Sequence, residues 1–235
     1  EAVRPEIVKR ITIKKESTTS LETGGYGQLL VSGNGLKGPM KNRVEIYVPK
    51  GRAGSQDLLA TGETNQPVDL LHGSYDVVIK AAPERAINKV EITRGAVKEL
   101  RLKDRGGLLL EVPGVQGESL SYPLVIYKAG DQKNRVADTH SGSAVELAPG
   151  SYDVYVKSLP PHWVKKVDVR SSSVSKRTLP QRGALLVTAP DTAGEPLKAD
   201  MQVFGTGTRA GVAQGQTDVP LALGPGRYDV LLDVA

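Results

Sequence analysis

The chain has 235 residues, of which 39% are hydrophobic and 24% charged, and its formal net charge is +5. This composition is typical of a globular chain rather than a disordered one, and the absence of cysteine excludes disulfides, thiolate metal sites and a cysteine nucleophile. No apolar run approaches the roughly 18 residues of a membrane-spanning helix, so we expect no transmembrane segment.

The first segment, "IVKRITIKKESTTSLE" (residues 7–22), resembles two later stretches of the same chain. These are "NKVEITRGAVKEL" (88–100) and "KKVDVRSSSVSKRTL" (165–179). The later two stand at the end of a repeated pattern, whereas residues 7–22 stand before its first copy. We therefore expect residues 1–23 to be an orphan closing segment, either the end of a preceding unit or a donor strand.

The repeated pattern opens each time with glycine and a run of aliphatic residues. It begins with "GQLLVSG" at Gly27, "GGLLLEVPG" at Gly106 and "GALLVTAPD" at Gly183. A second strand-like stretch in each copy then carries an aromatic residue at the matching position. These aromatic residues are Tyr47, Tyr127 and Phe204. Their constant order and nearly constant spacing predict a three-fold repeat.

Each copy also contains a sharp corner followed by Tyr-Asp-Val. The corners are "LLHGSYDVVI" (70–79), "LAPGSYDVYV" (147–156) and "LGPGRYDVLL" (223–232), and their tyrosines lie 77 and 76 residues apart. We expect a turn with glycine at positive φ. The tyrosine hydroxyl should bond to nearby backbone, as in the tyrosine corner of immunoglobulin-like sandwiches.

The residues after each corner alternate between apolar and polar, which predicts a strand with one face in the core. The predicted core face contains Tyr75, Val77 and Ile79, then Tyr152, Val154 and Val156, then Tyr228, Val230 and Leu232. The intervening Asp76, Asp153 and Asp229 should face water or a turn. No segment shows a helical period. The predicted fold is all-β: three tandem immunoglobulin-like/transthyretin-like β-sandwich repeats of about 77 residues.

The sequence "L-x-P-G-x-Y-D-V-x-V", after a leading "G-x-L-x-V" and a middle "V-x-I-Y", resembles transthyretin-like or carboxypeptidase-regulatory-like modules. It is also similar to the Cna-B and PEGA repeats of bacterial exported proteins. The resemblance covers nearly the whole chain and implies spacing, adhesion or assembly rather than chemistry. The Lys–Asn isopeptide arrangement of Cna-B proteins cannot be assigned here.

The predicted domains are residues 24–103, 104–180 and 181–235, and the last of these lacks its closing strands. Three explanations fit a chain that has an extra closing segment before its first repeat and lacks one after its third. The chain is a fragment of a longer array; or residues 7–22 of one molecule complete the third repeat of another, head to tail; or the three repeats close into a ring. Charge is weakly consistent with head-to-tail contact, because residues 1–20 are net positive and residues 183–235 net negative.

Residues with catalytic potential are scattered. We interpret His72 as a turn residue, His140 as part of a polar loop beside Asp138, and His162 as the neighbour of the only tryptophan, Trp163. The glycine runs "GNGLKG" and "GTGTRAG" are expected to be hairpin or loop turns. "APDTAGEP" (189–196) is likewise expected to be a turn. We assign no catalytic, cofactor-binding or metal-ligating residue and no cofactor, and expect no enzyme.

A basic stretch runs from Lys157 to Arg182, with seven Lys or Arg against one Asp. It lacks the interleaved aromatic residues of a nucleic-acid binder, so we expect no specific nucleic-acid partner. An anionic glycan or surface remains a candidate partner. For Trp163 we favour packing over its own sandwich against a place on a sugar-binding surface.

The sequence thus predicts a non-catalytic structural or adhesive segment of an exported bacterial protein, located outside the cell, at its surface or in the periplasm. Self-association through residues 7–22 is the expected protein contact. The alternative is a carbohydrate- or surface-binding accessory module of a larger enzyme or receptor.

Overall fold

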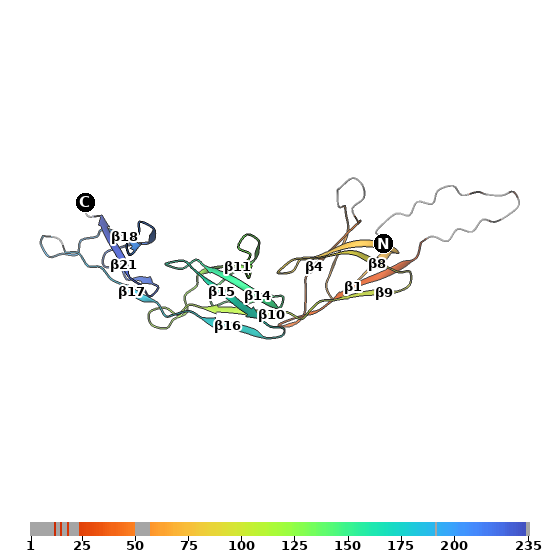
Figure 1. The fold of residues 1–235 in the computed structure, drawn as a ribbon, viewed down its shortest axis with the longest axis horizontal. Helices are drawn as coiled ribbons and strands as arrows, with labels where there is room; N and C mark the ends of the chain where they lie inside the picture. The colour runs from red at the N-terminus through yellow and green to blue at the C-terminus, as the bar shows by residue number, and fades with distance from the viewer. Residues whose placement is uncertain are drawn as a thin grey trace. The chain divides into compact units, whose positions relative to one another are not determined.

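The computed structural model describes residues 12, 15, 18, 24–49, 57–190 and 192–233. Within them the regular elements are all β-strands, and no helix of the length and apolar character needed to cross a membrane occurs there. The chain divides into two compact units, Glu1–Arg105 and Gly106–Ala235. The first unit holds one sandwich and the second holds two, which confirms the predicted all-β class with three tandem sandwich repeats (Figure 1).

Repeat 1, the sandwich built from β1 to β9, pairs a three-stranded sheet of order β6-β1-β9 with a four-stranded sheet of order β5-β4-β7-β8. The smaller sheet contains β1 (Tyr26–Ser32), β6 (Pro67–Leu71) and β9 (Val97–Arg101); the larger contains β4 (Arg43–Tyr47), β5 (Leu58–Glu63), β7 (Gly73–Ile79) and β8 (Arg85–Ile92). Strand β9 runs parallel to β1, and the other neighbours are antiparallel. The "GNGLKG" stretch forms the hairpin of β2 (Asn34–Gly35) and β3 (Gly38–Pro39), which confirms a turn.

Repeat 2, built from β10 to β16, has the same topology, with sheets of order β13-β10-β16 and β12-β11-β14-β15. Its strands are β10 (Gly106–Glu111), β11 (Pro123–Lys128), β12 (Arg135–His140), β13 (Val145–Leu147), β14 (Gly150–Val156), β15 (His162–Val169) and β16 (Val174–Thr178). Strand β16 again runs parallel to the first strand of the repeat. The closing pair β15 and β16 thus contributes one strand to each sheet, as β8 and β9 do in repeat 1.

Repeat 3, built from β17 to β21, has smaller sheets of order β17-β20 and β19-β18-β21. Its strands are β17 (Gly183–Leu185), β18 (Asp200–Gly205), β19 (Gly211–Gln216), β20 (Leu221–Leu223) and β21 (Tyr228–Asp233). Among the described residues, β21 pairs only with β18 and β17 only with β20. The two positions that β8 and β9 occupy in repeat 1 therefore have no strand in the described part of repeat 3. The domain boundaries at residues 24, 104 and 181 stay a prediction.

The tyrosine corner occurs in all three repeats, as predicted. Each hydroxyl donates to the carbonyl four residues earlier: Tyr75 to Leu71 at 2.8 Å, Tyr152 to Ala148 at 2.7 Å and Tyr228 to Gly224 at 2.7 Å. The bond ties the start of a core strand to the turn before it. It therefore fixes the register that places the following aliphatic residues inward.

The expectation of a positive φ at the corner glycine holds for Gly73, at 152°, and is wrong for the other two corners. At Gly226 the reason for glycine is space, because an added Cβ would lie 3.0 Å from the Tyr228 hydroxyl. The tyrosine ring closes over the backbone of this turn, and the close approach favours glycine at Gly226. At Gly150 the nearest atom would lie 3.8 Å away, which is an ordinary contact.

Asp229 is exposed, as expected, whereas the other two aspartates of the Tyr-Asp-Val motif differ from the expectation. Asp76 and Asp153 are 7% and 3% exposed, so neither faces water. Asp153 accepts hydrogen bonds from the backbone N–H groups of Gly130 at 3.0 Å and Lys166 at 2.9 Å. The Gly130 contact matches the predicted turn; Lys166 belongs to a β-bulge that the alternation of side chains did not reveal. These N–H groups stabilise the carboxylate and lower the pKa of Asp153.

A buried hydroxyl bridges two backbone groups in every repeat, and the sequence analysis missed it. Thr64, Ser141 and Thr217 are each less than 5% exposed. Ser141, for example, accepts from the N–H of Tyr122 at 2.8 Å and donates to the carbonyl of Leu120 at 2.5 Å. The three residues are 77 and 76 positions apart, so the spacing of the corner tyrosines was the signal that could have found them.

Candidate functional sites

The edge of β21 is open and apolar. Val77 in β7 and Val154 in β14 are fully buried, at 0% exposure, whereas Val230 at the same place in β21 is 40% exposed. The next residue, Leu231, is 56% exposed. The predicted core face is therefore correct for the first two repeats and wrong at Val230, because no described strand covers it. An uncovered strand edge offers unpaired N–H and C=O groups to another strand.

The core of repeat 3 is correspondingly small. Its buried cluster consists of Met201, Val203, Ala213 and Leu223 among the described residues, whereas the cluster of repeat 1 has twelve members. Leu186, next to β17, is 54% exposed. Exposed apolar residues thus lie on or next to β17 and β21, whose equivalents in the other repeats have an extra neighbour, although Val219, between β19 and β20, is also 55% exposed.

Among the described residues, Asp229 makes one of the two backbone contacts that Asp153 makes. It accepts from the N–H of Gly207 at 2.9 Å, as Asp153 accepts from Gly130. Asp153 uses its other oxygen for the bulge amide of the closing strand, at Lys166. A closing strand beside β21 would bring an equivalent amide to Asp229.

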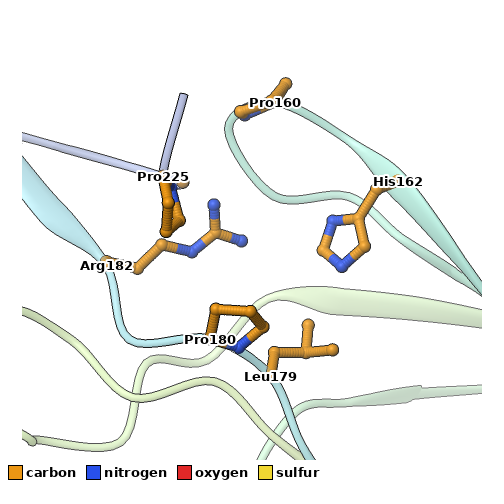
Figure 2. A pocket seen from close by; sticks show the side chains of 7 residues that line it. Pro160, His162, Leu179, Pro180, Arg182 and Pro225 are labelled. Atoms are coloured by element: carbon orange, nitrogen blue, oxygen red, sulfur yellow. The ribbon is translucent and has the colours of Figure 1, made fainter. Parts of the chain in front are cut away.

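A second feature of the Gly106–Ala235 unit is a cavity of about 250 Å³ (Figure 2). Pro160, Pro180 and Pro225 give it apolar walls, and the side chains of His162 and Arg182 point into it from opposite sides. Arg182 is 5% exposed. Its guanidinium donates to the carbonyl of Leu159 at 2.8 Å, and its Nε has no hydrogen-bond partner.

The same arginine occurs one repeat earlier. Arg105 lies 77 residues before Arg182, is 6% exposed, and donates to the carbonyl of Ala82, which matches Leu159 in position. In repeat 2 the guanidinium also lies over the ring of Tyr122, 5.4 Å from its centroid. A buried arginine that binds the same loop in two repeats fits a structural role, in which it holds the loop before the closing strand. Sequence reasoning missed both residues, although each directly precedes an opening glycine.

The surroundings of His162 lower its pKa. Burial lowers its pKa, and the positive charge of Arg182 lowers it further, while a hydrogen bond to the Pro160 carbonyl opposes both effects. Its Nδ1 lies 3.2 Å from the Ser158 hydroxyl. Among the contacts of His162 with the described residues there is no Asp or Glu carboxylate.

The other candidate residues do not lie together in one site. His72 is an exposed bend residue, as expected. His140 ends strand β12 and does not lie in a loop, and its neighbour Asp138 pairs with Arg135 at 3.1 Å. Pro190 and Pro196 form a bridge that makes "APDTAGEP" a turn; Asp191 lies outside the described residues. In the described part of the chain, no three His, Cys, Asp or Glu side chains are grouped as a metal site would need.

Three partly exposed aromatic rings gather on the outer face of the four-stranded sheet of repeat 2. The ring centroid of Trp163 lies 5.0 Å from that of Tyr155 and 5.4 Å from that of Tyr127, with interplanar angles of 45° and 50°. The rings come from β15, β14 and β11, which are adjacent in the sheet (Figure 1). They alternate with buried Ile126, Val154 and Val156 and therefore point away from the core. We call Tyr127, Tyr155 and Trp163 the aromatic platform.

No protein-family model and no curated protein sequence matches the chain. Among solved structures, similarity is found to the TIE protein of Bacillus anthracis, with 19% identity, a TM-score of 0.25, and coverage of 90% of this chain and 46% of that chain. The chain thus spans less than half of that protein.

Two pilins are also similar. The minor pilin GBS52 of Streptococcus agalactiae has 12% identity and a TM-score of 0.33, with 67% of this chain and 94% of that chain covered. The shaft pilin spaA of Lactobacillus rhamnosus GG has 12% identity and a TM-score of 0.25, with 68% and 99% covered.

Proposed function

We propose that the chain is a non-catalytic structural segment of an exported or surface bacterial protein, built from Cna-B-like or PEGA-like sandwich repeats, that assembles head to tail by strand addition. The single observation that carries the assembly is the open apolar edge of β21. The residues that recur in the repeats support the structural role, because they are tyrosine corners, hydroxyl bridges and loop-binding arginines rather than groups that perform chemistry.

Residues 7–22, of which the structure describes only positions 12, 15 and 18, are the proposed occupant of that edge. Aligned with the closing strands, Ile11 takes the place of Val90 and Val167, and Ile13 the place of Ile92 and Val169. All four of these equivalents are at most 4% exposed. A strand of this pattern, added beside β21, would cover Val230 with aliphatic side chains and extend the sheet through backbone hydrogen bonds.

The alignment also gives the register. Lys89 and Lys166 occupy the bulge in β8 and β15, and their N–H groups bind Asp76 and Asp153, each at 2.9 Å. Arg10 stands at the matching position of the donor segment. We therefore assign its N–H to Asp229, whose hydrogen bond to Gly207 leaves the other carboxylate oxygen for this amide.

The test is the mass of the 235-residue chain in solution, measured by light scattering over a range of concentrations. The intact chain should form concentration-dependent oligomers, and deletion of residues 1–22 should leave monomers. The double variant Ile11→Asp/Ile13→Asp should behave like the deletion, because it puts charges where the core needs apolar side chains. Thr12→Asp is the matched control, since its equivalents Glu91 and Asp168 are exposed and acidic.

A second variant changes the accepting strand β21 instead of residues 7–22, so the test does not depend on the donor segment alone. Val230→Asp should abolish assembly while leaving repeat 2 folded. Oligomers that persist after the deletion, or an intact chain that stays monomeric at every concentration, would show that residues 7–22 do not complete another copy.

A second candidate function is a carbohydrate-binding accessory module. One observation favours it, the aromatic platform on repeat 2, whose rings are not needed to close the sandwich.

A further inference from the structure

The fold does not require the aromatic platform, because the other repeats lack it. Strand pairing places Val78 and Ala86 of repeat 1 where repeat 2 has Tyr155 and Trp163. In repeat 3 the residue that matches Tyr155 is Leu231, one position after Val230 in β21. The inward residues of these strands stay similar from repeat to repeat, whereas these outward residues do not. The platform is therefore a property of repeat 2 alone.

Repeat 1 uses the same sheet face for a different purpose. There Glu45 accepts from the Tyr47 hydroxyl at 2.7 Å and pairs with Lys80 at 3.3 Å. The Tyr47 bond is the main cause of the lowered pKa of Glu45. In repeat 2 the residue at the place of Glu45 is Val125, so Tyr127 has no acidic neighbour at this position and its ring packs on Trp163 instead.

Aromatic faces that remain accessible recognise a particular kind of surface. The face of a ring is electron-rich and its edge is electron-poor, so it attracts the weakly positive C–H groups on the flat side of a sugar ring. Neighbouring tilted rings on a sheet suit a chain of such units. All three residues are partly exposed, which the proposed contact requires.

Charged side chains next to the aromatic platform determine whether it favours a neutral or a charged sugar. Lys165 follows Trp163 by two residues on β15 and is exposed, as is Lys166. Both act on Asp153, but that carboxylate is buried and already bound by backbone N–H groups. Arg135 and Asp138 neutralise each other in an ion pair. The exposed charges near the rings include Lys165 and Lys166 on β15 and Lys157 directly after β14, against Asp168 further along β15. The excess of lysine favours an anionic ligand.

We propose that the aromatic platform of repeat 2 binds an acidic polysaccharide, with sugar rings stacked on Trp163 and its two tyrosines and a carboxylate near Lys165. This inference rests on the second candidate function and names its ligand class. It is independent of strand addition, because the platform and the β21 edge lie on different strands.

The test uses the single tryptophan of the chain as a reporter at the site. The intact chain is titrated with polygalacturonate, a uronic-acid polymer, and separately with neutral dextran, while the Trp163 emission is recorded. Polygalacturonate should change the emission in a saturable way. Dextran should bind up to about fivefold more weakly, since this is roughly the largest change in affinity that one surface ion pair gives. Added salt should weaken the polygalacturonate titration.

Substitutions test whether the polymer binds at the aromatic platform. Tyr127→Ala should lower the affinity for polygalacturonate by about tenfold or more, in line with the loss of one stacked ring, and Lys165→Gln should lower it without affecting the weak dextran signal. Tyr47→Ala is the matched control, because it removes the equivalent aromatic ring from repeat 1. Circular dichroism checks that each variant is folded.

Each of the following binding results would overturn the proposal: an unchanged Trp163 emission with both polymers, equal affinity for the neutral and acidic polymers, or equal losses for Tyr127→Ala and Tyr47→Ala. A change in solution mass for Tyr127→Ala without loss of polymer binding would also overturn it, because the platform would then be a protein contact. Failure of strand addition has a separate readout, the mass of the intact chain, so the two proposals can fail independently.

Discussion

Replacing the equivalent valine in repeats 2 and 3, Val154 and Val230, tests whether each sandwich is held by its own core. Val154→Ala removes two methyl groups from a side chain with 0% exposure. At about 0.8 kcal/mol for each buried carbon, the transfer cost is about 1.6 kcal/mol. The cavity that remains raises the expected loss to about 2–3 kcal/mol. Val230→Ala changes a side chain that is 40% exposed and should cost under about 1 kcal/mol.

Urea unfolding followed by Trp163 emission reports on repeat 2, because Trp163 lies in β15, which pairs with the strand that carries Val154. Val154→Ala should lower the midpoint of this transition by about 1–3 M, given a slope of about 1–3 kcal/mol per molar for a small domain. Val230→Ala should leave the transition unchanged, since its side chain belongs to repeat 3. An equal shift in both variants would show that the two repeats share one cooperative core, and the account of separate sandwiches would then be wrong.

Three further predictions concern repeat 2 and are read from the same Trp163 transition. Tyr152→Phe removes the bond to the Ala148 carbonyl and should cost about 1 kcal/mol. Ser141→Ala should cost more, about 1–3 kcal/mol, because it leaves a buried N–H and a buried C=O without their partner. The lowered pKa of Asp153 predicts that its stabilising effect is complete above the unfolded-state pKa of about 3.9 and is lost as the pH falls through the lower folded-state value; Asp153→Asn should flatten this acid dependence, and an unaltered pH profile would contradict the assignment.

The strands and their inward faces were predictable because two local signals agree. The alternation of Tyr152, Val154 and Val156 sets which side is apolar, and the corner before it sets where the strand starts. Both signals recur at a nearly fixed spacing, so each repeat checks the others. The same reasoning gave the Tyr152 hydroxyl bond, because its acceptor lies only four residues away.

Features that join distant segments were not predictable in the same way. Asp153 looked like a surface residue because its polar side chain alternates with apolar ones, but a β-bulge in β15 brings the N–H of Lys166 to it. The pairing of Ser141 with Tyr122 and Leu120, and of Arg182 with Leu159, likewise depends on loops that meet only in the folded chain. A single sequence shows the spacing of these residues but not their partners.

Val230 shows the difference between what the local sequence predicts and what depends on contacts with distant segments. Its sequence context is that of a core residue, since it follows a tyrosine corner as Val77 and Val154 do. Its exposure differs because burial in this fold needs the strand that closes the repeat, and that strand comes from a separate stretch of sequence in repeats 1 and 2. Val230 thus has the sequence context of a core residue, but the described part of repeat 3 does not bury it. Exposed apolar surface is favourable to bury, and this is the physical basis of the proposal that residues 7–22 of another copy add a strand here.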